Sequence, residues 1–531
     1  MNRWGPRLWR SVLADTFPKA SLWASLKVLA LACGVRTAFL FLWPDVFVAD
    51  PDAYRVLAET LDRFGVLGVP SSDGIHARAT AFRPPLYPWL LSWLVVDGSL
   101  SPALVGCFHV VIGGLTAMLA YRIVLQIMQW RFVNPPDAKW PEIEIRGGLA
   151  ALLVACDPIL LVQSTAIMTE TLATFLAALG WWFWNRRWSR CPKMQRRGRT
   201  GPIWMLRRLG LGTVLALAFL CRPTFLVWAV LLLLGECFWG YRRNRTQPRR
   251  VWVSAIAMAL PLVLAMSSWI IRNQRQVDAP VWATTHGGYT LLLANNPLFY
   301  QHIAASPWRI GPLDRRWDAS DFLAAHACRY NGDPATAEFW EKKWQVIAPE
   351  MPTALPKSTK GLPESTTSLS GGKSFRAQGV VTEVSDDRYL QRAAIATIQR
   401  SPLEFLRSCL VRLARLWSPL PHEGPEVLRI GIGVFYTAVL VVAFWGLLAS
   451  RWYCDRLWWP GIALVIALSA VHAVYWSNLR MRAPATIVLA VAVAMTVPKR
   501  LTLSENGTIC YAGRHEAAVP KRRSAKRYRI R

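Results

Sequence analysis

The chain alternates between long apolar runs and shorter polar connections. Runs of about 20 residues with almost no charge are long enough to cross the roughly 30 Å hydrocarbon core of a bilayer. They predict ten membrane crossings, at 21–43, 101–129, 147–163, 167–184, 209–221, 223–240, 251–271, 428–449, 457–476 and 483–497. The pattern therefore predicts an all-α polytopic membrane protein, with transmembrane regions over 21–271 and 428–497.

One polar segment, residues 44–100, follows the first span and contains an amphipathic stretch. Its apolar residues recur at helical spacing, at Val56, Leu57, Leu61 and Phe64. This spacing predicts a helix lying on the membrane surface.

A second polar segment, residues 272–427, carries 18 basic and 15 acidic residues, so it is nearly balanced in charge. Within it, residues 352–380 are rich in Ser, Thr, Gly, Pro and Lys. Such a composition buries too little apolar surface to become ordered and predicts a flexible insertion in a large domain. A disulfide between Cys328 and Cys409 is possible in this segment.

Charge orients the spans. The 531-residue chain is 53% hydrophobic and has a formal net charge of +30, and its basic residues gather in residues 1–20, 186–208, 242–250 and 498–531. Because cytoplasmic loops carry the excess of Lys and Arg, both termini are predicted to be cytoplasmic and the two polar segments non-cytoplasmic, which places the protein in a cell (inner) membrane. The basic tail, 498–531, is expected to contact anionic lipid, and nothing in the charge requires nucleic acid.

Several charged groups lie at or near membrane depth, where they are costly and usually face a cavity or a partner. Asp157 and Glu170 lie within the hydrophobic hairpin 147–184. Residues 209–240 are few for two crossings, and Arg222-Pro223 interrupts them, because proline breaks a helix. Two short tilted helices or a re-entrant hairpin would fit.

The residues that could carry chemistry each have a plainer interpretation. Asp50 and Asp52 precede the amphipathic stretch, where they could cap a helix or face a substrate at the membrane surface. Arg83 lies among three prolines in a rigid elbow that is either a turn or part of a site. Four arginines at predicted outer span ends could snorkel, or could converge as a phosphate clamp, namely Arg222, Arg272, Arg480 and Arg482.

The order of these motifs resembles the GT-C glycosyltransferases, in particular the protein O-mannosyltransferase and aminoarabinose transferase branch (glycosyltransferase family 39-like). The resemblance covers roughly residues 21–497. It is carried by Asp50-x-Asp52 with Tyr54 and Ala58, Arg83-Pro84-Pro85-Leu86-Tyr87-Pro88, Met168-Thr169-Glu170, Arg222-Pro223, Trp269-Ile270-Ile271-Arg272-Asn273, Gly287-Gly288, Asn295-Asn296-Pro297 and Arg480-Met481-Arg482-Ala483-Pro484.

The resemblance implies a transferase that moves a sugar from a polyprenyl-phosphate donor to a lipid, glycan or protein acceptor, with inversion. It implies catalytic roles for Asp50, as the base, with Asp52 and Glu170. It also implies a substrate-binding set made of Tyr54, Arg83, Tyr87, Arg222, Arg272, Asn273, Asn296, Arg480 and Arg482.

Two alternatives stay open at this point. Asp50 and Asp52 could hold Mg²⁺ or Mn²⁺, which prefer oxygen ligands, although the arginines can neutralise a phosphate without a metal. A transporter or flippase of a lipid-linked substrate would also use arginines in the membrane and acidic residues at its surface.

Overall fold

A computed structural model of the protein describes residues 19–43, 46–48, 50, 52–71, 74–131, 140–188, 202–243, 248–296, 299–300, 303–304, 383–421, 425–450 and 455–496. The predictions for the insertion 352–380, for the tail 498–531, for most of the arm 1–20 and for Cys328 lie outside these residues.

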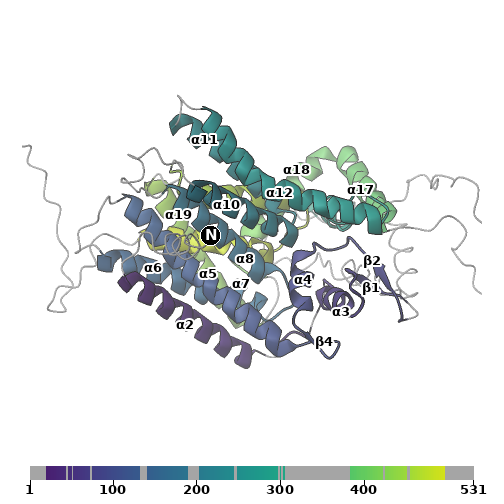
Figure 1. Ribbon diagram of the computed structural model, residues 1–531, viewed down its shortest axis with the longest axis horizontal. Helices are drawn as coiled ribbons and strands as arrows, with labels where there is room; N and C mark the ends of the chain where they lie inside the picture. The colour runs from purple at the N-terminus through teal and green to yellow at the C-terminus, as the bar shows by residue number, and fades with distance from the viewer. Residues whose placement is uncertain are drawn as a thin grey trace, which may run out of the picture.

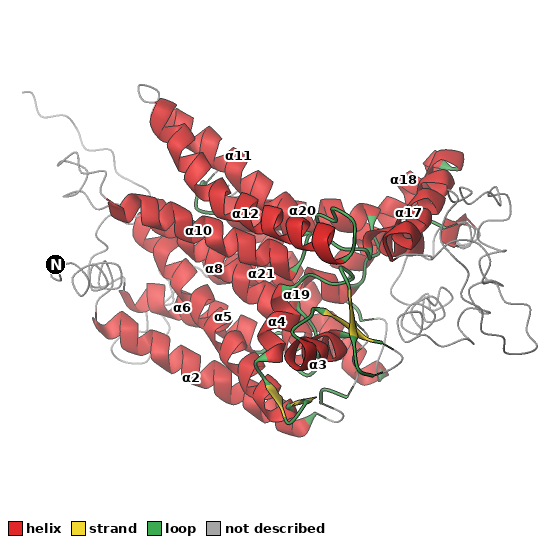
Figure 2. Cartoon of the chain, turned by 45° about the vertical axis from the view of Figure 1, so that its right-hand side comes forward, coloured by secondary structure: helices red, strands yellow, loops and turns green. Residues whose placement is uncertain are grey.

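Long helices run side by side and form a bundle (Figures 1 and 2). They are α2 (Lys19–Leu42), α5 (Pro102–Arg131), α6 (Trp140–Ala155), α8 (Glu170–Trp188), α10 (Pro202–Cys221), α11 (Phe225–Arg243), α12 (Pro248–Gln276), α19 (Glu426–Ser450), α20 (Trp459–Val474) and α21 (Thr486–Thr496), joined by the short α7 (Pro158–Gln163) and the 3-10 helix η3 (Leu479–Ala485). The prediction of a helical bundle is confirmed.

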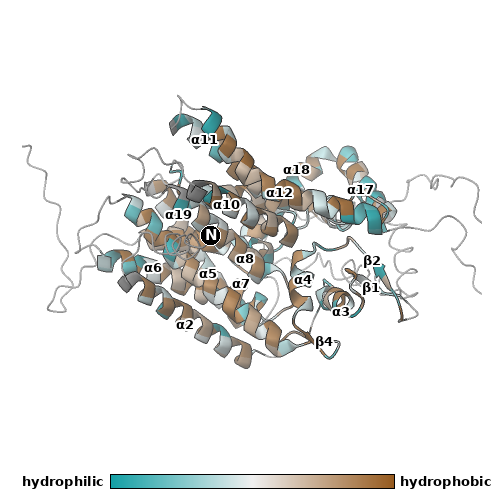
Figure 3. Ribbon diagram, in the orientation of Figure 1, coloured by the Kyte–Doolittle hydropathy of each residue, from teal (hydrophilic) through white to brown (hydrophobic). Residues whose placement is uncertain are grey.

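Six of the described helical segments are long and apolar enough to cross a membrane: Leu22–Leu42, Pro102–Trp130, Phe225–Arg242, Pro248–Gln276, Glu426–Leu448 and Leu479–Thr496. The apolar helix Trp459–Val474 is shorter. In Figure 3 the middle of the bundle is mostly hydrophobic, whereas hydrophilic residues gather toward its two ends. This distribution fits a polytopic membrane protein, and the count of ten crossings stays a prediction.

The helices around Asp157 and before Arg222 differ from those that the sequence predicts. The predicted span 147–163 is two helices, because Asp157 caps α7 through Leu160 N (3.0 Å) and Pro158 occupies its first turn. The helix before Arg222 begins at Pro202 rather than at 209, so α10 and α11 contain 20 and 19 residues. The apparent shortage of length for two crossings came from placing the start of α10 too late.

Buried tryptophans fix the helices of the bundle to one another. The indole N–H groups of Trp181, Trp184 and Trp228 donate to backbone carbonyl oxygens of residues 457, 456 and 460, at 2.7 to 2.9 Å. These carbonyl groups lie just before and in the first turn of α20, so the three bonds hold α8 and α11 against that end of the helix. A large apolar ring with one polar atom suits this position.

A second set of elements lies at one end of the bundle, the end at the right of Figure 1. It contains α3 (Tyr54–Phe64), α4 (Leu86–Ser92), α13 (Gly287–Ala294), α17 (Glu383–Arg400), α18 (Pro402–Trp417) and two antiparallel hairpins, β1 (Gly68–Pro70) with β2 (Ala77–Ala79) and β3 (Val95–Val96) with β4 (Ser99–Leu100). In the first hairpin Gly68 pairs with Ala79 and Val69 with Arg78.

Helix α3 covers the stretch for which the sequence predicts an amphipathic helix, and its position on the membrane surface stays a prediction. It buries Tyr54, Leu57 and Ala58 on one side. Residues from both polar segments, 44–100 and 272–427, therefore meet at this end of the bundle. The site is built there.

Candidate functional site

Asp50 is bound to the start of α3. Its two carboxylate oxygens accept hydrogen bonds from the backbone N–H groups of Tyr54 (2.9 Å) and Arg55 (2.8 Å). The residue next to the helix, Ala53, has a left-handed backbone (φ 58°) and supplies no side-chain cap, so Asp50 takes that part. Burial raises the pKa of the Asp50 carboxyl, and the two backbone N–H groups oppose that rise.

Asp52 is engaged differently, by a side chain. Its Oδ1 lies 2.7 Å from Arg83 Nη2, and Arg83 Nε donates to the Asp52 backbone carbonyl at 3.1 Å. The guanidinium group also lies over the rings of Phe82 (4.3 Å) and Tyr54 (5.7 Å). The proline elbow that contains Arg83 thus holds Asp52.

A second polar group is centred on Glu170, the first residue of α8, whose side chain is fully buried. Glu170 Oε1 lies 2.7 Å from Arg222 Nη2 and 3.8 Å from Arg480 Nε. Arg222 Nε also donates to Thr169 Oγ1 at 2.6 Å, and Arg480 Nη1 lies 3.9 Å from Met168 Sδ. Three distant segments meet here: the start of α8, the α10–α11 junction and η3.

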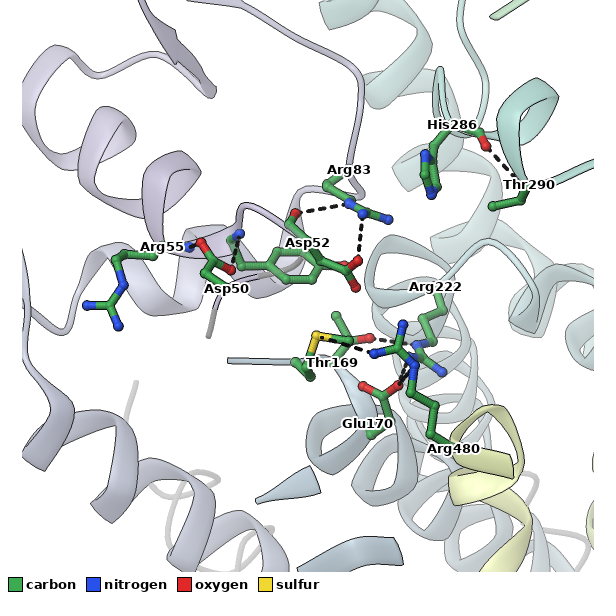
Figure 4. A network of polar contacts seen from close by, with 12 residues as sticks. Asp50, Asp52, Arg55, Arg83, Thr169, Glu170, Arg222, His286, Thr290 and Arg480 are labelled. Carbon is green, nitrogen blue, oxygen red and sulfur yellow. Dashed lines mark hydrogen bonds and ion pairs between the residues drawn. The ribbon is translucent and has the colours of Figure 1, made fainter. Parts of the chain in front are cut away.

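The two groups lie close to each other at the same end of the bundle (Figure 4). Asp52 points toward the side on which Arg222 lies, whereas Asp50 points toward Arg55. Tyr54 lies near both groups: burial raises the pKa of its hydroxyl, and the charges of Arg83 and Arg222 oppose that rise. The arrangement places carboxylates and guanidinium groups around a single region.

Two of the four predicted clamp arginines do not join this cluster. Arg272 donates to the backbone carbonyls of Thr80 and Leu67, both at 2.7 Å, and to Asn273 Oδ1 at 2.9 Å. Since Asn273 Nδ2 in turn donates to the Val281 carbonyl at 2.8 Å, these residues fasten the polar segment 44–100 to the end of α12.

Arg482 lies fully buried, donates to the carbonyls of Leu416 (3.2 Å) and Ser418 (2.6 Å), and covers the ring of Tyr436 at 4.4 Å. The convergence of all four arginines is therefore wrong: Arg222 and Arg480 meet, while Arg272 and Arg482 bind backbone oxygens elsewhere.

Two further predicted site residues have internal partners. The Tyr87 hydroxyl is buried 2.9 Å from His109 Nε2. The Asn296 amide is buried, donates to the carbonyls of Leu292 and Leu293, and accepts from Phe299 N at 2.9 Å. Both side chains stabilise local structure, Tyr87 beside Tyr54 and Asn296 after the end of α13.

Nothing in the sequence indicates Glu383 as part of the site, because its partners lie 98 to 303 residues before it in the chain. Its carboxylate accepts from Thr80 Oγ1 (2.6 Å), from Ala81 N (3.0 Å) and from the hydroxyl of Thr285. It thereby ties α17 to the residues just before Arg83 and its proline elbow. Only the three-dimensional structure brings these groups together.

His286 is another neighbour of the site that the sequence does not indicate. Its ring packs edge-on against Phe82, with centroids 4.9 Å apart. Burial lowers the pKa of His286 well below its ordinary value, and the nearby Arg83 charge lowers it further. The imidazole is thus neutral and packs at the border of the cluster.

The acidic pair does not fit a divalent cation. Both Asp50 oxygens accept backbone hydrogen bonds and Asp52 pairs with Arg83, so the carboxylates do not converge as oxygen ligands would. Within the part of the chain that the structure describes, no cluster of three or more His, Cys, Asp or Glu residues could hold a metal.

No protein-family profile matches the chain, and no curated protein matches its sequence. Solved structures with a similar course of the chain include the oligosaccharyltransferase AglB of Archaeoglobus fulgidus in complex with an inhibitory peptide and a dolichol-phosphate (13% identity, TM-score 0.41, 89% of this chain and 50% of that one). An oligosaccharyltransferase of Archaeoglobus fulgidus in complex with zinc and sulfate gives 15% identity and a TM-score of 0.44 over 88% of this chain and 48% of that one.

A third similar structure is ArnT of Cupriavidus metallidurans bound to undecaprenyl phosphate, with 12% identity and a TM-score of 0.34 over 89% of this chain and 77% of that one. The chain spans about half the length of the oligosaccharyltransferase that it matches.

Proposed function

We propose that the protein is a membrane glycosyltransferase that takes a sugar from a polyprenyl-phosphate donor and works at the non-cytoplasmic face. The observation that carries this proposal is the meeting of Glu170, Arg222 and Arg480 beside the Asp52–Arg83 pair. This cluster lies at the polar end of apolar helices, where a lipid phosphate at the membrane surface would reach it.

Arg222 and Arg480 are the groups best placed to bind the donor phosphate. One guanidinium group can bind two phosphate oxygens at once, and it keeps its positive charge. Glu170 acts as a positioning residue, because a fully buried carboxylate between the two arginines holds both cations at one place. Their charge would stabilise the phosphate as it leaves.

A carboxylate of the first outer loop would accept the proton of the acceptor. The acceptor oxygen or nitrogen attacks the anomeric carbon, the bond from that carbon to the phosphate oxygen breaks, and the polyprenyl phosphate departs on the opposite face, with inversion. Of the two candidates, Asp52 faces the arginines whereas Asp50 caps α3. We therefore favour Asp52 as the base and Asp50 as the residue that fixes the loop.

Arginines neutralise the phosphate in this mechanism, so no step requires a divalent metal. The acceptor in this proposal is a lipid, a glycan or a protein. Activity that persists in excess EDTA is the expected result, and loss that is restored by Mg²⁺ or Mn²⁺ would refute this part of the proposal.

The test is sugar release from the lipid. The purified full-length chain in liposomes is given a radiolabelled polyprenyl-phosphate sugar and membrane acceptors, without ATP or an ion gradient. Transfer of the label to an acceptor, with release of polyprenyl phosphate, is expected, and it should be lost when Arg222 is replaced by Gln. Movement of intact labelled lipid between leaflets without release would instead establish the flippase alternative.

A further inference from the structure

Helix α18 (Pro402–Trp417) exposes a continuous row of leucines. The exposed fractions of Leu403, Leu406 and Leu410 are 78%, 59% and 67%. Because positions three and four apart lie on one face of a helix, these side chains form a single stripe, which Ala414 extends. A stripe of this kind is unusual on a surface that faces water.

The preceding helix gives a direct contrast. Helix α17 (Glu383–Arg400) mainly exposes polar and charged side chains, among them Gln391, Arg392, Gln399 and Arg400. The two helices follow each other with one residue between them and lie at the same end of the bundle (Figure 2). One of them therefore has a surface suited to water and the other has not.

The leucine stripe cannot turn inward, because the opposite side of α18 is fastened to the bundle. Arg412 is fully buried and donates from Nε to the Ala473 carbonyl at 2.7 Å and from Nη1 to the Ala294 carbonyl. At the end of the helix, Arg482 binds the carbonyls of Leu416 and Ser418. The exposure of the stripe is thus part of the packed structure.

The stripe is continuous in the chain with a surface that suits lipid. After α18 the connection packs on the beginning of α19, where Arg429 Nε donates to the Pro421 carbonyl at 3.0 Å. Helix α19 is a candidate membrane span and exposes large apolar side chains, including Val434, Phe444 and Trp445, with 65% to 70% exposure. Helix α18 therefore ends at the outer end of a lipid-facing helix.

The direction and the edges of α18 suit a position in the membrane surface. In Figure 2 the helix runs across the direction of α5 rather than along it. Glu404 and Arg407 flank the stripe and lie 3.6 Å apart, each about one-third exposed. An amphipathic helix with leucines on one side and such charges at its border matches the boundary between acyl chains and headgroups.

We infer that α18 is an interfacial helix that inserts Leu403, Leu406 and Leu410 into the outer leaflet of the bilayer. Its partner is the acyl-chain boundary of ordinary phospholipids. Through Arg482, which belongs to the same short helix η3 as Arg480, the depth of α18 in the leaflet sets the height of the polar cluster above the acyl chains. The inference rests on the membrane fold and does not depend on the transferase activity.

The test is a photo-crosslinking experiment with the full-length protein in nanodiscs of phosphatidylethanolamine and phosphatidylglycerol. A benzophenone amino acid replaces Leu406 in one variant and Leu410 in a second. The matched control replaces Gln399, which is exposed on α17. After illumination, mass spectrometry measures the phospholipid adducts on each variant, and only variants that elute as single species before illumination are compared.

Phospholipid adducts at positions 406 and 410 should exceed those at position 399 by at least about tenfold, because only the stripe contacts acyl chains. Equal yields at positions 406 and 399 would overturn the inference. Adducts at position 406 that join two copies of the chain would also overturn it, since the stripe would then be a protein interface.

Discussion

Two buried carboxylates, Asp157 and Glu170, each lie at the start of a helix near two arginines, yet the two groups are built differently. Asp157 Oδ1 accepts from Leu160 N at 3.0 Å and from the Tyr436 hydroxyl at 2.8 Å. Both neighbouring arginines donate to backbone carbonyls: Arg36 to those of residues 154 and 160, and Arg482 to those of residues 416 and 418.

Around Glu170 the partners are side chains. Arg222 and Arg480 meet its carboxylate, and Arg222 also binds the hydroxyl of Thr169. Their side chains remain 15% and 30% exposed, whereas Arg482 has no exposed surface. Backbone partners cannot be exchanged without loss of the fold, but side-chain partners can turn toward a ligand. We infer that the Asp157 group closes a helix break and that the Glu170 group binds substrate.

The largest expected effect comes from removing the two carboxylate charges separately. Glu170→Gln should lower the transfer rate by about 10²–10³-fold, because the two arginines lose the group that holds them toward the leaving phosphate. Asp157→Asn should leave the rate within about threefold and lower the thermal unfolding temperature instead, since the nearby buried Arg36 and Arg482 lose an opposite charge.

The measurements are label transfer per folded molecule and thermal unfolding in detergent for both variants. If Asp157→Asn lowers the rate as strongly as Glu170→Gln at an unchanged unfolding temperature, the distinction between the two groups fails.

A smaller effect is expected when an arginine of each group is replaced by lysine, which keeps the positive charge. Arg222→Lys should reduce the transfer rate by about 10- to 100-fold, since an ammonium group cannot contact Thr169 and Glu170 through a rigid planar fork. Arg482→Lys should mainly lower stability, because it loses bonds to two carbonyls. If Arg222→Lys leaves both the maximal rate and the half-saturating donor concentration unchanged, Arg222 does not belong to the proposed phosphate site.

The Asp157 group can also be tested by a substitution that changes no charge. Tyr436→Phe removes the hydroxyl that donates to Asp157 and to which Ile159 N donates at 3.2 Å. Leaving these buried groups unsatisfied should cost about 1–3 kcal/mol of stability. The rate per folded molecule should not change. A drop in rate without a drop in unfolding temperature would assign Tyr436 to the reaction.

The sequence predicts the helices and helix breaks around the Asp157 and Glu170 groups well. Hydropathy gives the helices, and Arg222-Pro223 marks the junction of α10 and α11 because proline breaks a helix wherever it occurs. The start of α10 was missed because Arg208 suggested a loop. In the structure, Arg208 lies inside the helix and donates to Ser254 Oγ of α12 at 2.9 Å.

Partners distant in the chain could not be predicted. Arg480 and Arg482 look equivalent in sequence, but in a 3-10 helix residues two apart point in different directions, because each turn takes about three residues. One arginine therefore meets Glu170 and the other binds the end of α18. Glu383 is joined to Thr80 only by the fold.

The smallest effect concerns Asp50, which the family resemblance assigns as the base but which caps a helix as Asp157 does. Asp50→Asn keeps an oxygen for one of the two backbone N–H groups, so the rate should stay within about threefold if Asp50 only positions the loop, whereas a general base contributes about 10²–10⁴-fold. Loss of transfer in this variant, with Asp52→Asn still active, would return the base role to Asp50.

The pH dependence of stability gives the same variant a second measurement. Burial raises the pKa of Asp50 in the folded state, so its protonated form is favoured there, and its contribution to stability is lost as the pH rises through the folded-state pKa. Asn does not titrate. As the pH rises from about 4 to about 7, the unfolding temperature of Asp50→Asn should therefore increase relative to that of the unsubstituted protein. A difference that stays constant over this range would mean that the backbone N–H groups fully offset the burial of Asp50.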